Sequence, residues 1–403
     1  MKKKISIIGL GYVGLPLAVS FSKYFNVIGF DINNNRIKQL KKGNDITNEI
    51  NLKKKYKKTL KFTSDEKDLQ KTDIFIVTVP TPINKKKTPD LSALKSASKL
   101  VGNYITYKNL VIFESTVYPG CTEEVCIPII EKVSNLISNK DFFYGYSPER
   151  INPGDKKNTL EKVIKIVSGS NNQALRKISL IYKKIIKAGI YKAQTIKVAE
   201  AAKIIENIQR DINIAFMNEV FLIFNNLNIN SKEVFKAANT KWNFLNFKPG
   251  LVGGHCIGVD PYYLAYKAKL EKCSSEILLT GRNINAKMYQ YVVKNTLKKI
   301  KDRKKPTVLL LGQTFKENVP DVRNSQAVTV FDTLKKKKIK VFTYDPTQIY
   351  TKTNLKLLEI KKLKFDLIVV LVGHKKFKKL DYNFYKKILK KNSTIYDPFN
   401  KID

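Results

Sequence analysis

The sequence predicts an α/β protein in which two doubly wound units are joined by a central helical domain. Three observations carry this prediction. Short apolar runs typical of buried parallel strands alternate with helical patterns near both ends of the chain. A glycine-rich turn at residues 9–14 separates the first such run from the first helical pattern. Long 3.6-residue periodicities at residues 198–224 and 278–300 predict helices in the middle.

The first residues predict a Rossmann-like, dinucleotide-binding unit. A strand is expected at residues 5–8, a helix at 15–23 and a second strand at 27–30, with the sequence Gly-Leu-Gly-Tyr-Val-Gly at 9–14. The lysines at 2–4 and the apolar residues behind them resemble a secretory leader. The strand and the glycine turn account for the same residues better.

Each glycine of the turn has a physical task. Gly9 permits the tight turn, Gly11 lets the backbone approach a pyrophosphate, and Gly14 lets helix and strand pack closely. The N–H groups at the helix N-terminus then face the phosphates. Asp31 has the spacing of a carboxylate that binds the adenosine ribose, which favours NAD over NADP because it repels a 2′-phosphate. Arg36 weakens this preference, since a nearby arginine can accept that phosphate.

Polar clusters follow three further expected strands. These are residues 72–79 followed by Pro-Thr-Pro, 110–113 followed by Glu-Ser-Thr, and 143–146 followed by Ser-Pro-Glu-Arg. Ordinary turn chemistry is one explanation of such clusters. Open α/β sheets bind ligands at the carboxyl ends of their strands, so recurrence at three ends favours a binding site.

The C-terminal hundred residues predict a second α/β unit. Strands are expected at 307–312, 339–344 and 365–372 and a helix at 324–335. The last strand is similar to the run at 72–79. In place of GxGxxG stands Gly-Gln-Thr-Phe-Lys-Glu from residue 312, so we expect a ligand other than a dinucleotide.

These patterns predict three domains. We expect an N-terminal NAD-binding domain at 1–195, a central helical domain at 196–300 and a C-terminal α/β domain at 301–403. The lysine-rich stretch 298–305 before Pro306 marks the second boundary.

Composition excludes some classes of protein. With 43% hydrophobic and 27% charged residues the chain is not disordered. Its 75 Lys and Arg against 34 Asp and Glu give +41, but only seven of the cations are arginine. Nucleic-acid readers rely on arginine, so we interpret the lysines as a solvated surface and keep a basic nucleic-acid-binding protein as the alternative from another class.

Other features limit the compartment and the cofactors. No apolar run reaches the roughly 18 residues that a membrane span needs. Four cysteines make no disulfide framework, and reduced thiols indicate a cytoplasmic protein. Two histidines, His255 and His374, make no histidine-rich metal site, so no metal is expected.

Three segments carry residues suited to chemistry. A helical segment places Lys203 and Asn207 on one face, although a solvated helix face would look the same. Residues 249–261 read Pro-Gly-Leu-Val-Gly-Gly-His-Cys-Ile-Gly-Val-Asp-Pro, and glycines this dense let a loop wrap around a ligand. Cys256 and Asp260 in that loop are hard to explain as core packing. The third segment, 312–325, begins the second α/β unit.

Together with residues 9–14, Ser115-Thr116 and Ser147-Pro-Glu, these segments resemble the nucleotide-sugar 6-dehydrogenase family, which includes UDP-glucose and GDP-mannose dehydrogenases. The resemblance runs in order from Gly9 to Arg323, and its Gly-Gly-x-Cys-x-x-x-Asp element is highly specific.

Two stretches, 147–155 and 253–263, resemble the branch that oxidises UDP-N-acetylhexosamines for capsules and O-antigens. Pro153 stands where members that oxidise UDP-glucose usually carry an acid.

The resemblance implies a four-electron oxidation of a C6 hydroxyl to a carboxylate with two NAD. UDP-N-acetylglucosamine is the preferred substrate, and UDP-GalNAc, UDP-ManNAc and UDP-glucose are alternatives. Cys256 would trap the aldehyde as a thiohemiacetal and then form a thioester. Lys203 and Asn207 would stabilise the thiolate and the oxyanions. The resemblance also implies that water is held or deprotonated by Glu149, Thr116 and Asp260.

The resemblance further implies two sets of binding residues. Those for NAD are Gly9, Gly11, Tyr12, Val13, Gly14, Asp31, Arg36, Thr81, Thr116 and Arg323. Those for the UDP-sugar are Glu149, Arg150, Ile151, Asn152, Lys203, Asn207, Arg210, Phe244, Leu245, Asn246, Gly250 and Lys316. The central helices resemble the dimer interface of the family, and His255 marks the branch rather than a catalytic residue. A hydroxyacid or phosphogluconate dehydrogenase on the same architecture would leave the Cys256 loop unexplained.

Overall fold

A computed structural model describes residues 3–47, 49–52, 59–151, 155, 157–254, 257–347 and 354–402 of the chain. The chain divides into two compact units. The first unit comprises Met1–Glu206 with Tyr262–Ser274, and the second comprises Asn207–Pro261 with Ser275–Asp403. Two helices, α6 (Ile196–Asn226) and α8 (Asp260–Leu270), belong in part to each unit.

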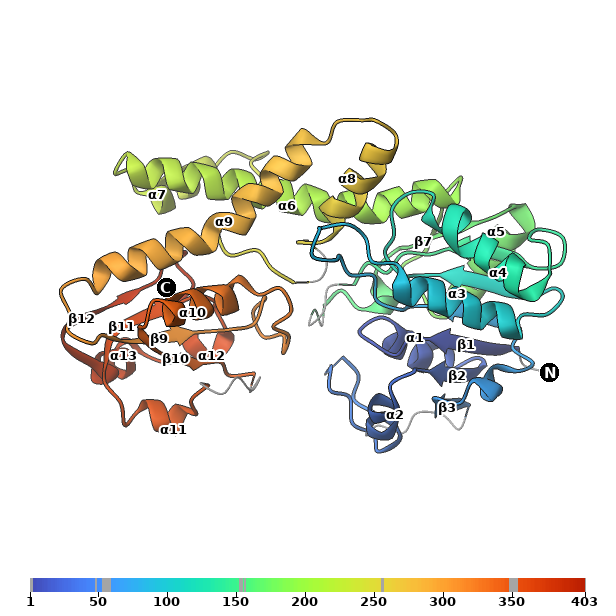
Figure 1. Ribbon diagram of the computed structural model, residues 1–403, viewed down its shortest axis with the longest axis horizontal. Helices are drawn as coiled ribbons and strands as arrows, with labels where there is room; N and C mark the ends of the chain where they lie inside the picture. Colours follow the sequence, from blue (N-terminus) through green and yellow to red (C-terminus); the bar gives the residue numbers. More distant parts are fainter. Residues whose placement is uncertain are drawn as a thin grey trace. The chain divides into compact units, whose positions relative to one another are not determined.

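The first unit contains an eight-stranded sheet with the order of a dinucleotide-binding fold. Figure 1 labels β1, β2, β3 and β7 of this sheet. In spatial order its strands are β3 (Leu60–Thr63), β2 (Asn26–Phe30), β1 (Lys4–Ile8), β4 (Ile74–Val77), β5 (Leu110–Phe113), β6 (Phe143–Tyr146), β7 (Lys165–Gly169) and β8 (Ile190–Lys192). Every neighbouring pair is parallel except β6 and β7. The strand order reverses between β1 and β4, where such sheets bind nucleotides.

Apolar strand residues and amphipathic helices build the core of this unit. The helices are α1 (Gly14–Phe21), α2 (Asn34–Lys41), α3 (Ser92–Tyr104), α4 (Ile127–Ser134) and α5 (Asn172–Tyr182), with short turns η1 (Glu66–Leu69), η2 (Thr122–Cys126) and η3 (Leu160–Lys162). Ile5 and Ile7 of β1 share one buried cluster with Leu17 of α1 and Ile178 of α5. Burial of such side chains is the main term that stabilises the sheet.

The second unit contains a four-stranded, all-parallel sheet. In spatial order its strands are β10 (Lys340–Tyr344), β9 (Thr307–Leu311), β11 (Phe365–Val370) and β12 (Leu389–Tyr396). Its other helices are α7 (Ser231–Ala238), α9 (Glu276–Lys299), α10 (Gln326–Lys336), α11 (Leu357–Ile360), α12 (Lys375–Lys378) and α13 (Tyr382–Ile388). Val308 and Leu310 of β9 belong to one apolar cluster, and Leu309 and Leu311 belong to another, so this sheet is covered on both faces.

The first turn of each sheet has the same local form. Gly9 has φ +94° and its N–H donates to the carbonyl of Phe30 at the end of β2. Gly312 has φ +87° and its N–H donates to the carbonyl of Tyr344 at the end of β10. Both positions lie in the left-handed region that favours glycine. The second unit therefore repeats the strand-turn start of the first without the GxGxxG sequence.

The α/β class with parallel sheets and long central helices is confirmed. The expected strand at 72–79 is shorter, because β4 covers only Ile74–Val77. The sequence prediction did not include β3, β7, β8 and β12, which are short or interrupted by lysine and other polar residues. The division into three domains and its two boundaries remain a prediction. Among the helices that the structure describes, none combines the length and the hydropathy that a membrane span requires.

Candidate active site

The glycine turn between β1 and α1 leaves space that a pyrophosphate requires. A Cβ atom placed on Gly14 would lie 1.8 Å from the carbonyl oxygen of Gly9, so this position must remain glycine for helix and strand to pack. A Cβ atom on Gly11 would meet no described protein atom within 4 Å. Gly11 therefore borders open space beside the N-terminus of an eight-residue helix, which suits NAD phosphates. Tyr12 and Val13 are half-buried in the same turn.

Asp31 and Arg36 lie against the same turn. The Asp31 carboxylate accepts the N–H of Leu10 at 2.8 Å through Oδ2 and the N–H of Asn33 at 2.9 Å through Oδ1. Arg36 is buried; its Nε donates to the Leu10 carbonyl at 3.0 Å and its Nη2 donates to Asp45 at 2.9 Å. Its Nη1 has no hydrogen-bond partner among the described residues. An acidic group and a cation thus border the turn that is predicted to bind NAD.

Hydrogen bonds connect the loops that follow β1, β4 and β5. Thr78 donates to the carbonyl of Gly9 at 2.7 Å, and Thr81 donates to the carbonyl of Thr116 at 2.6 Å. Thr81 and Thr116, both predicted to contact NAD, are therefore neighbours. The hydroxyl of Tyr263 donates to the Thr81 carbonyl at 2.9 Å and holds this loop from the start of α8.

Glu149 lies just beyond the end of β6, and its carboxylate has defined donors. Oε1 accepts the N–H groups of Arg150 and Ile151 at 2.6 and 2.7 Å, and Oε2 lies 3.3 Å from Nζ of Lys165. Arg150 in turn donates from Nε to Glu206 at 2.8 Å. Of the residues predicted beside Glu149, Asn152 lies outside the described residues.

Helix α6 carries both predicted catalytic residues of the central segment. Lys203 is half-buried and belongs to the first unit, whereas Asn207 belongs to the second. Asn207 is 6% exposed, and its Nδ2 donates to Oδ2 of Asp260 at 2.6 Å. Asp260, the first residue of α8, is itself buried. The second unit thus brings together two predicted catalytic residues that are 53 positions apart in sequence. His255 and Cys256 lie outside the described residues.

Side chains of the second unit hold the glycine-rich loop as far as Gly254. Asn218 of α6 exchanges two hydrogen bonds with the backbone of Gly250, at 2.8 and 3.1 Å. Gln326 donates to the carbonyl of Val252 at 2.8 Å. Gly254 has φ +89°, and a Cβ atom there would lie 2.6 Å from the ring of Phe315. The loop therefore packs closely on the turn after β9, and a larger residue at 254 would be strained.

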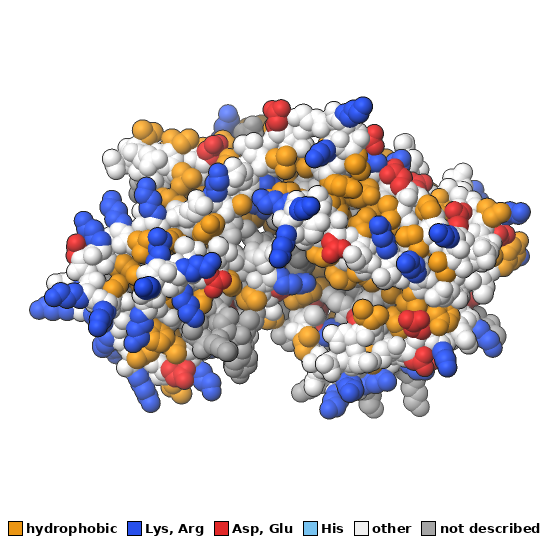
Figure 2. Space-filling view, in the orientation of Figure 1, with side chains coloured by type: hydrophobic (Ala, Val, Ile, Leu, Met, Phe, Trp, Pro, Cys, Tyr) orange, Lys and Arg blue, Asp and Glu red, His pale blue; other side chains and the backbone are white. Residues whose placement is uncertain are grey.

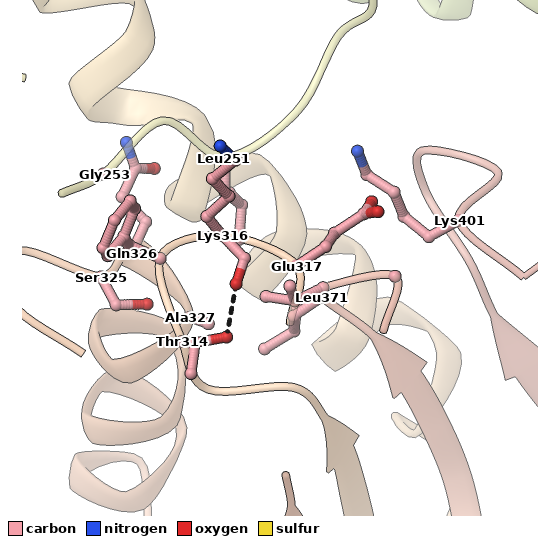
Figure 3. Close-up of a pocket in the computed structure, with 13 residues that line it drawn as sticks. Leu251, Gly253, Thr314, Lys316, Glu317, Ser325, Gln326, Ala327, Leu371 and Lys401 are labelled. Carbon is pink, nitrogen blue, oxygen red and sulfur yellow. Dashed lines mark hydrogen bonds between the residues drawn. The ribbon is translucent and has the colours of Figure 1, made fainter. Parts of the chain in front are cut away.

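A cavity of about 310 Å³ lies beside this loop (Figure 3). Its walls come from the glycine-rich loop, the turn after β9, the start of α10, the end of β11 and the segment after β12, and include Leu251, Gly253, Thr314, Lys316 and Lys401. Strand order reverses between β9 and β11, the place where open sheets bind ligands. The Thr314 hydroxyl donates to the Lys316 carbonyl at 2.9 Å, as drawn in Figure 3. Two ammonium groups and the carboxylate of Glu317 line it, so its wall has a net positive charge that suits an anionic ligand.

The other predicted binding residues of the second unit are spread around it. Leu245 is 56% exposed, Phe244 is half-buried and Asn246 is exposed. Arg210 is half-buried on α6. Arg323, predicted to contact NAD, belongs to the second unit, where it pairs with Asp321 at 2.5 Å.

Several residues of these sites were not found by sequence reasoning. Tyr263 was noticed only as part of a motif, and Lys401 and Gln326 carried no signal beyond composition. The buried Lys165 lies on a strand that was not predicted. Glu114, by contrast, belongs to the polar cluster after residues 110–113, which the sequence analysis predicted as part of a binding site.

Comparison with known protein families assigns all three parts of the chain. Residues 3–186 match the NAD binding domain of the UDP-glucose/GDP-mannose dehydrogenase family, residues 197–287 match its central domain, and residues 309–403 match its UDP binding domain.

Individual proteins agree with this match. Protein CapL of Staphylococcus aureus is 49% identical over 393 residues, which cover 95% of this chain and 93% of that protein. UDP-N-acetyl-D-glucosamine 6-dehydrogenase of Salmonella typhi is 48% identical over 98% of this chain and 95% of its own length. The solved structure of UDP-D-ManNAc dehydrogenase from Pyrococcus horikoshii superimposes with a TM-score of 0.90 at 31% identity, covering 99% of this chain and 96% of that chain.

Fold, loops and matches together define an NAD-dependent nucleotide-sugar dehydrogenase. The chain belongs to the UDP-glucose/GDP-mannose dehydrogenase family. The family expected from the motifs is thereby confirmed, as are the NAD cofactor and the class of enzyme. A hydroxyacid or phosphogluconate dehydrogenase is no longer needed to explain the fold.

Proposed function

We propose that this chain oxidises the C6 hydroxyl of a UDP-N-acetylhexosamine, with UDP-N-acetylglucosamine as the substrate, to the uronic acid. Two hydrides leave the sugar carbon in succession, and bound NAD accepts each one. With one water consumed, one alcohol and two NAD⁺ give one carboxylate, two NADH and three protons. We propose capsule or O-antigen precursor synthesis in the cytoplasm as the setting of this reaction.

The buried Asn207–Asp260 contact is the observation that carries the proposal. Asp260 follows Cys256 by four positions in the sequence. The residue expected to accept a proton therefore lies close in the chain to the expected nucleophile. Cys256 attacks the C6 aldehyde after the first hydride transfer and forms a thiohemiacetal. The second hydride transfer leaves a thioester, whose carbon–sulfur bond breaks when water attacks.

The remaining chain residues have supporting tasks in this proposal. Lys203 and Asn207 stabilise the thiolate and the oxyanions by charge and hydrogen bonding. Glu149, Thr116 and Asp260 hold the attacking water, and a carboxylate among them accepts its proton. The cavity with Lys316 at its wall holds the UDP part of the substrate.

The choice of UDP-N-acetylglucosamine as the substrate is supported by sequence identity to named relatives. Two proteins named UDP-N-acetyl-D-glucosamine 6-dehydrogenase are 48% and 47% identical to this chain. A protein named UDP-N-acetyl-D-mannosamine dehydrogenase is 34% identical. Pro153, where UDP-glucose enzymes carry an acid, supports the same choice. UDP-GalNAc, UDP-ManNAc and UDP-glucose are the alternatives that the assay must compare.

The test is NADH formation with a panel of UDP-sugars for the wild type, Cys256→Ala and Cys273→Ser. Cys273 is an exposed free thiol, which makes its variant a matched control. We expect two NADH per UDP-N-acetylglucosamine, loss of this activity in Cys256→Ala and full activity in Cys273→Ser.

Three results would change the proposal in different ways. Faster turnover of another N-acetylated sugar would replace the substrate and keep the chemistry. Turnover of UDP-glucose alone would contradict the branch. One NADH per sugar, or an active Cys256→Ala enzyme, would contradict the thioester route.

A further inference from the structure

A buried lysine in the first unit has no task in the reaction described above. Lys165, the first residue of β7, is 3% exposed. Its Nζ lies 2.8 Å from Oε2 of Glu114 and 3.3 Å from Oε2 of Glu149. One ammonium group is therefore shared by two carboxylates, one of which belongs to the proposed catalytic set.

Strand pairing places Lys165 beside Glu149. β6 and β7 are antiparallel, and they pair Gly145 with Gly169 and Tyr146 with Ser168. In an antiparallel pair, a step of one residue forward on β6 corresponds to a step of one residue backward on β7. Continued beyond the end of β6, the same count would place Glu149 opposite Lys165, and the 3.3 Å contact between their side chains agrees with it. The only antiparallel pair within the eight-stranded sheet of the described chain thus sets which side chain meets the carboxylate.

Glu114 and Tyr182 hold the lysine from the opposite side. The Glu114 side chain follows β5 and is fully buried, and its second oxygen accepts the hydroxyl hydrogen of Tyr182. Nζ of Lys165 also lies 5.3 Å from the centre of the Tyr182 ring. Burial by itself would lower the pKa of Lys165, but the charges of Glu114 and Glu149 outweigh it and raise that pKa, so the side chain is an ammonium.

Three donors define the orientation of the Glu149 carboxylate. The N–H groups of Arg150 and Ile151 take Oε1, and Lys165 faces Oε2. The Glu149 side chain is 12% exposed. Three donors therefore surround this carboxylate, and Lys165 is the charged one among them.

We propose that Lys165 is a positioning residue whose charge holds the Glu149 carboxylate in place for the hydrolytic step. In that step water forms a bond to the thioester carbon, its proton passes to Glu149, and the Cys256 thiolate leaves. Glu114 and Tyr182 act one step further away, because they hold Lys165. This inference rests on the role proposed above for Glu149.

The first test is Lys165→Met, which preserves length and removes charge. We expect kcat to fall by about 10- to 100-fold and the acidic limb of the kcat–pH profile to move up by about one pH unit or more. Lys23→Met is the matched control, because Lys23 pairs with Glu161 at 2.9 Å on the surface of the same unit. It should leave kcat and the pH profile unchanged.

The second test is Glu114→Gln, which removes the competing carboxylate. The positive charge of Lys165 then faces the charge of Glu149 alone, so the acidic limb of the kcat–pH profile should move to lower pH. Lys165→Met and Glu114→Gln should therefore move the acidic limb in opposite directions. An electrostatic effect on Glu149 produces such opposite shifts, and a loss of packing does not. If Lys165→Met does not fold, the direction of the Glu114→Gln shift decides: a shift to lower pH supports the inference, and an unchanged profile overturns it.

A Glu149→Gln variant separates this inference from the proposed function. We expect it to lose kcat, and adding Lys165→Met should then cost little more because both act on one group. An active Glu149→Gln enzyme would remove Glu149 from the mechanism and overturn this inference with it. An inactive Glu149→Gln enzyme beside a folded Lys165→Met enzyme of normal kcat and pH profile would overturn the inference alone.

Discussion

At the scale of single residues, the contact between Asn207 and Asp260 gives the sharpest prediction for activity. Both side chains are buried, and 2.6 Å separates Nδ2 of Asn207 from Oδ2 of Asp260. The substitution Asp260→Asn keeps the size and an acceptor oxygen but removes the charge. We expect kcat to fall by about 10²- to 10³-fold, with a melting temperature within about 2 °C of the wild type. Steady-state NADH formation and thermal melting check this, and kcat within about threefold of the wild type would refute it.

Glu200 gives a residue-scale prediction for stability against pH. This carboxylate on α6 is buried, and it accepts the N–H groups of Gly120 and Thr122 at 2.6 and 3.0 Å. Burial raises its pKa from 4.5 to about 7, and the hydrogen bonds from Thr122 and Gly120 only partly oppose this rise. Between these values the folded protein binds a proton that the unfolded chain has released, so this group makes stability fall as pH rises from about 4.5 to 7.

The variant Glu200→Gln should remove this dependence, because the amide resembles the protonated acid at every pH. Relative to the wild type, its melting temperature should rise across that window and stay constant above it. Thermal melts of both proteins at several pH values are the measurement. A difference between them that does not change with pH would contradict the assigned titration.

At the scale of an element, two glycines of the β1-turn-α1 segment should have different effects when substituted, one on folding and the other on cofactor binding. Gly14→Ala would place a Cβ atom 1.8 Å from the Gly9 carbonyl, so we expect it to unfold or strongly destabilise the first unit. Gly11→Ala meets no described protein atom within 4 Å, so it should melt like the wild type. If the turn holds the pyrophosphate, Gly11→Ala should still weaken NAD affinity by about tenfold or more, measured by calorimetry. Unchanged NAD affinity in a folded Gly11→Ala protein would place the pyrophosphate elsewhere.

At the scale of the whole molecule, α6 presents an apolar stripe that we propose as the homodimer surface. Phe216 and Ile223, in the part of α6 that belongs to the second unit, are 56% and 47% exposed. Their spacing of seven residues brings both to one face of the helix. Exposed apolar stripes of this kind mark association surfaces.

Light scattering tests this arrangement. We expect a mass about twice the 46.2 kDa of the chain for the wild type and a single chain mass for Phe216→Glu. Ile137→Glu, at a position 54% exposed in the first unit, is the matched control and should stay dimeric. A monomeric wild type, or a dimeric Phe216→Glu protein, would contradict the proposed surface.

The net charge of +41 is also a property of the whole molecule. On the visible face, Lys and Arg side chains are interspersed with apolar and uncharged ones (Figure 2). Such interspersed lysines suit a solvated surface that attracts anions without selecting one. The nucleotide-sugar dehydrogenase assignment does not depend on this charge.

The sequence by itself determined the features that depend on local order. Strand, glycine turn and helix follow one another within residues 4–21, so periodicity and the φ demand of Gly9 were sufficient to predict that segment. The family followed from short motifs, and the family matches confirmed it. Polar clusters at strand ends predicted that the loops after β4 and β5 lie together, because parallel strands bring their carboxyl ends to one side, and Thr81 and Thr116 are neighbours there.

Only the tertiary structure decided which distant residues meet. Lys165 looks like any other lysine in the sequence, and the antiparallel pairing of β7 with β6 makes it the buried partner of Glu149. Asn207 and Asp260 are 53 positions apart, and folding joins them at 2.6 Å. Such contacts depend on strand register, which decides which side chains face one another. They also depend on burial, which changes the energy of a charge by removing water. Local periodicity in the sequence encodes neither.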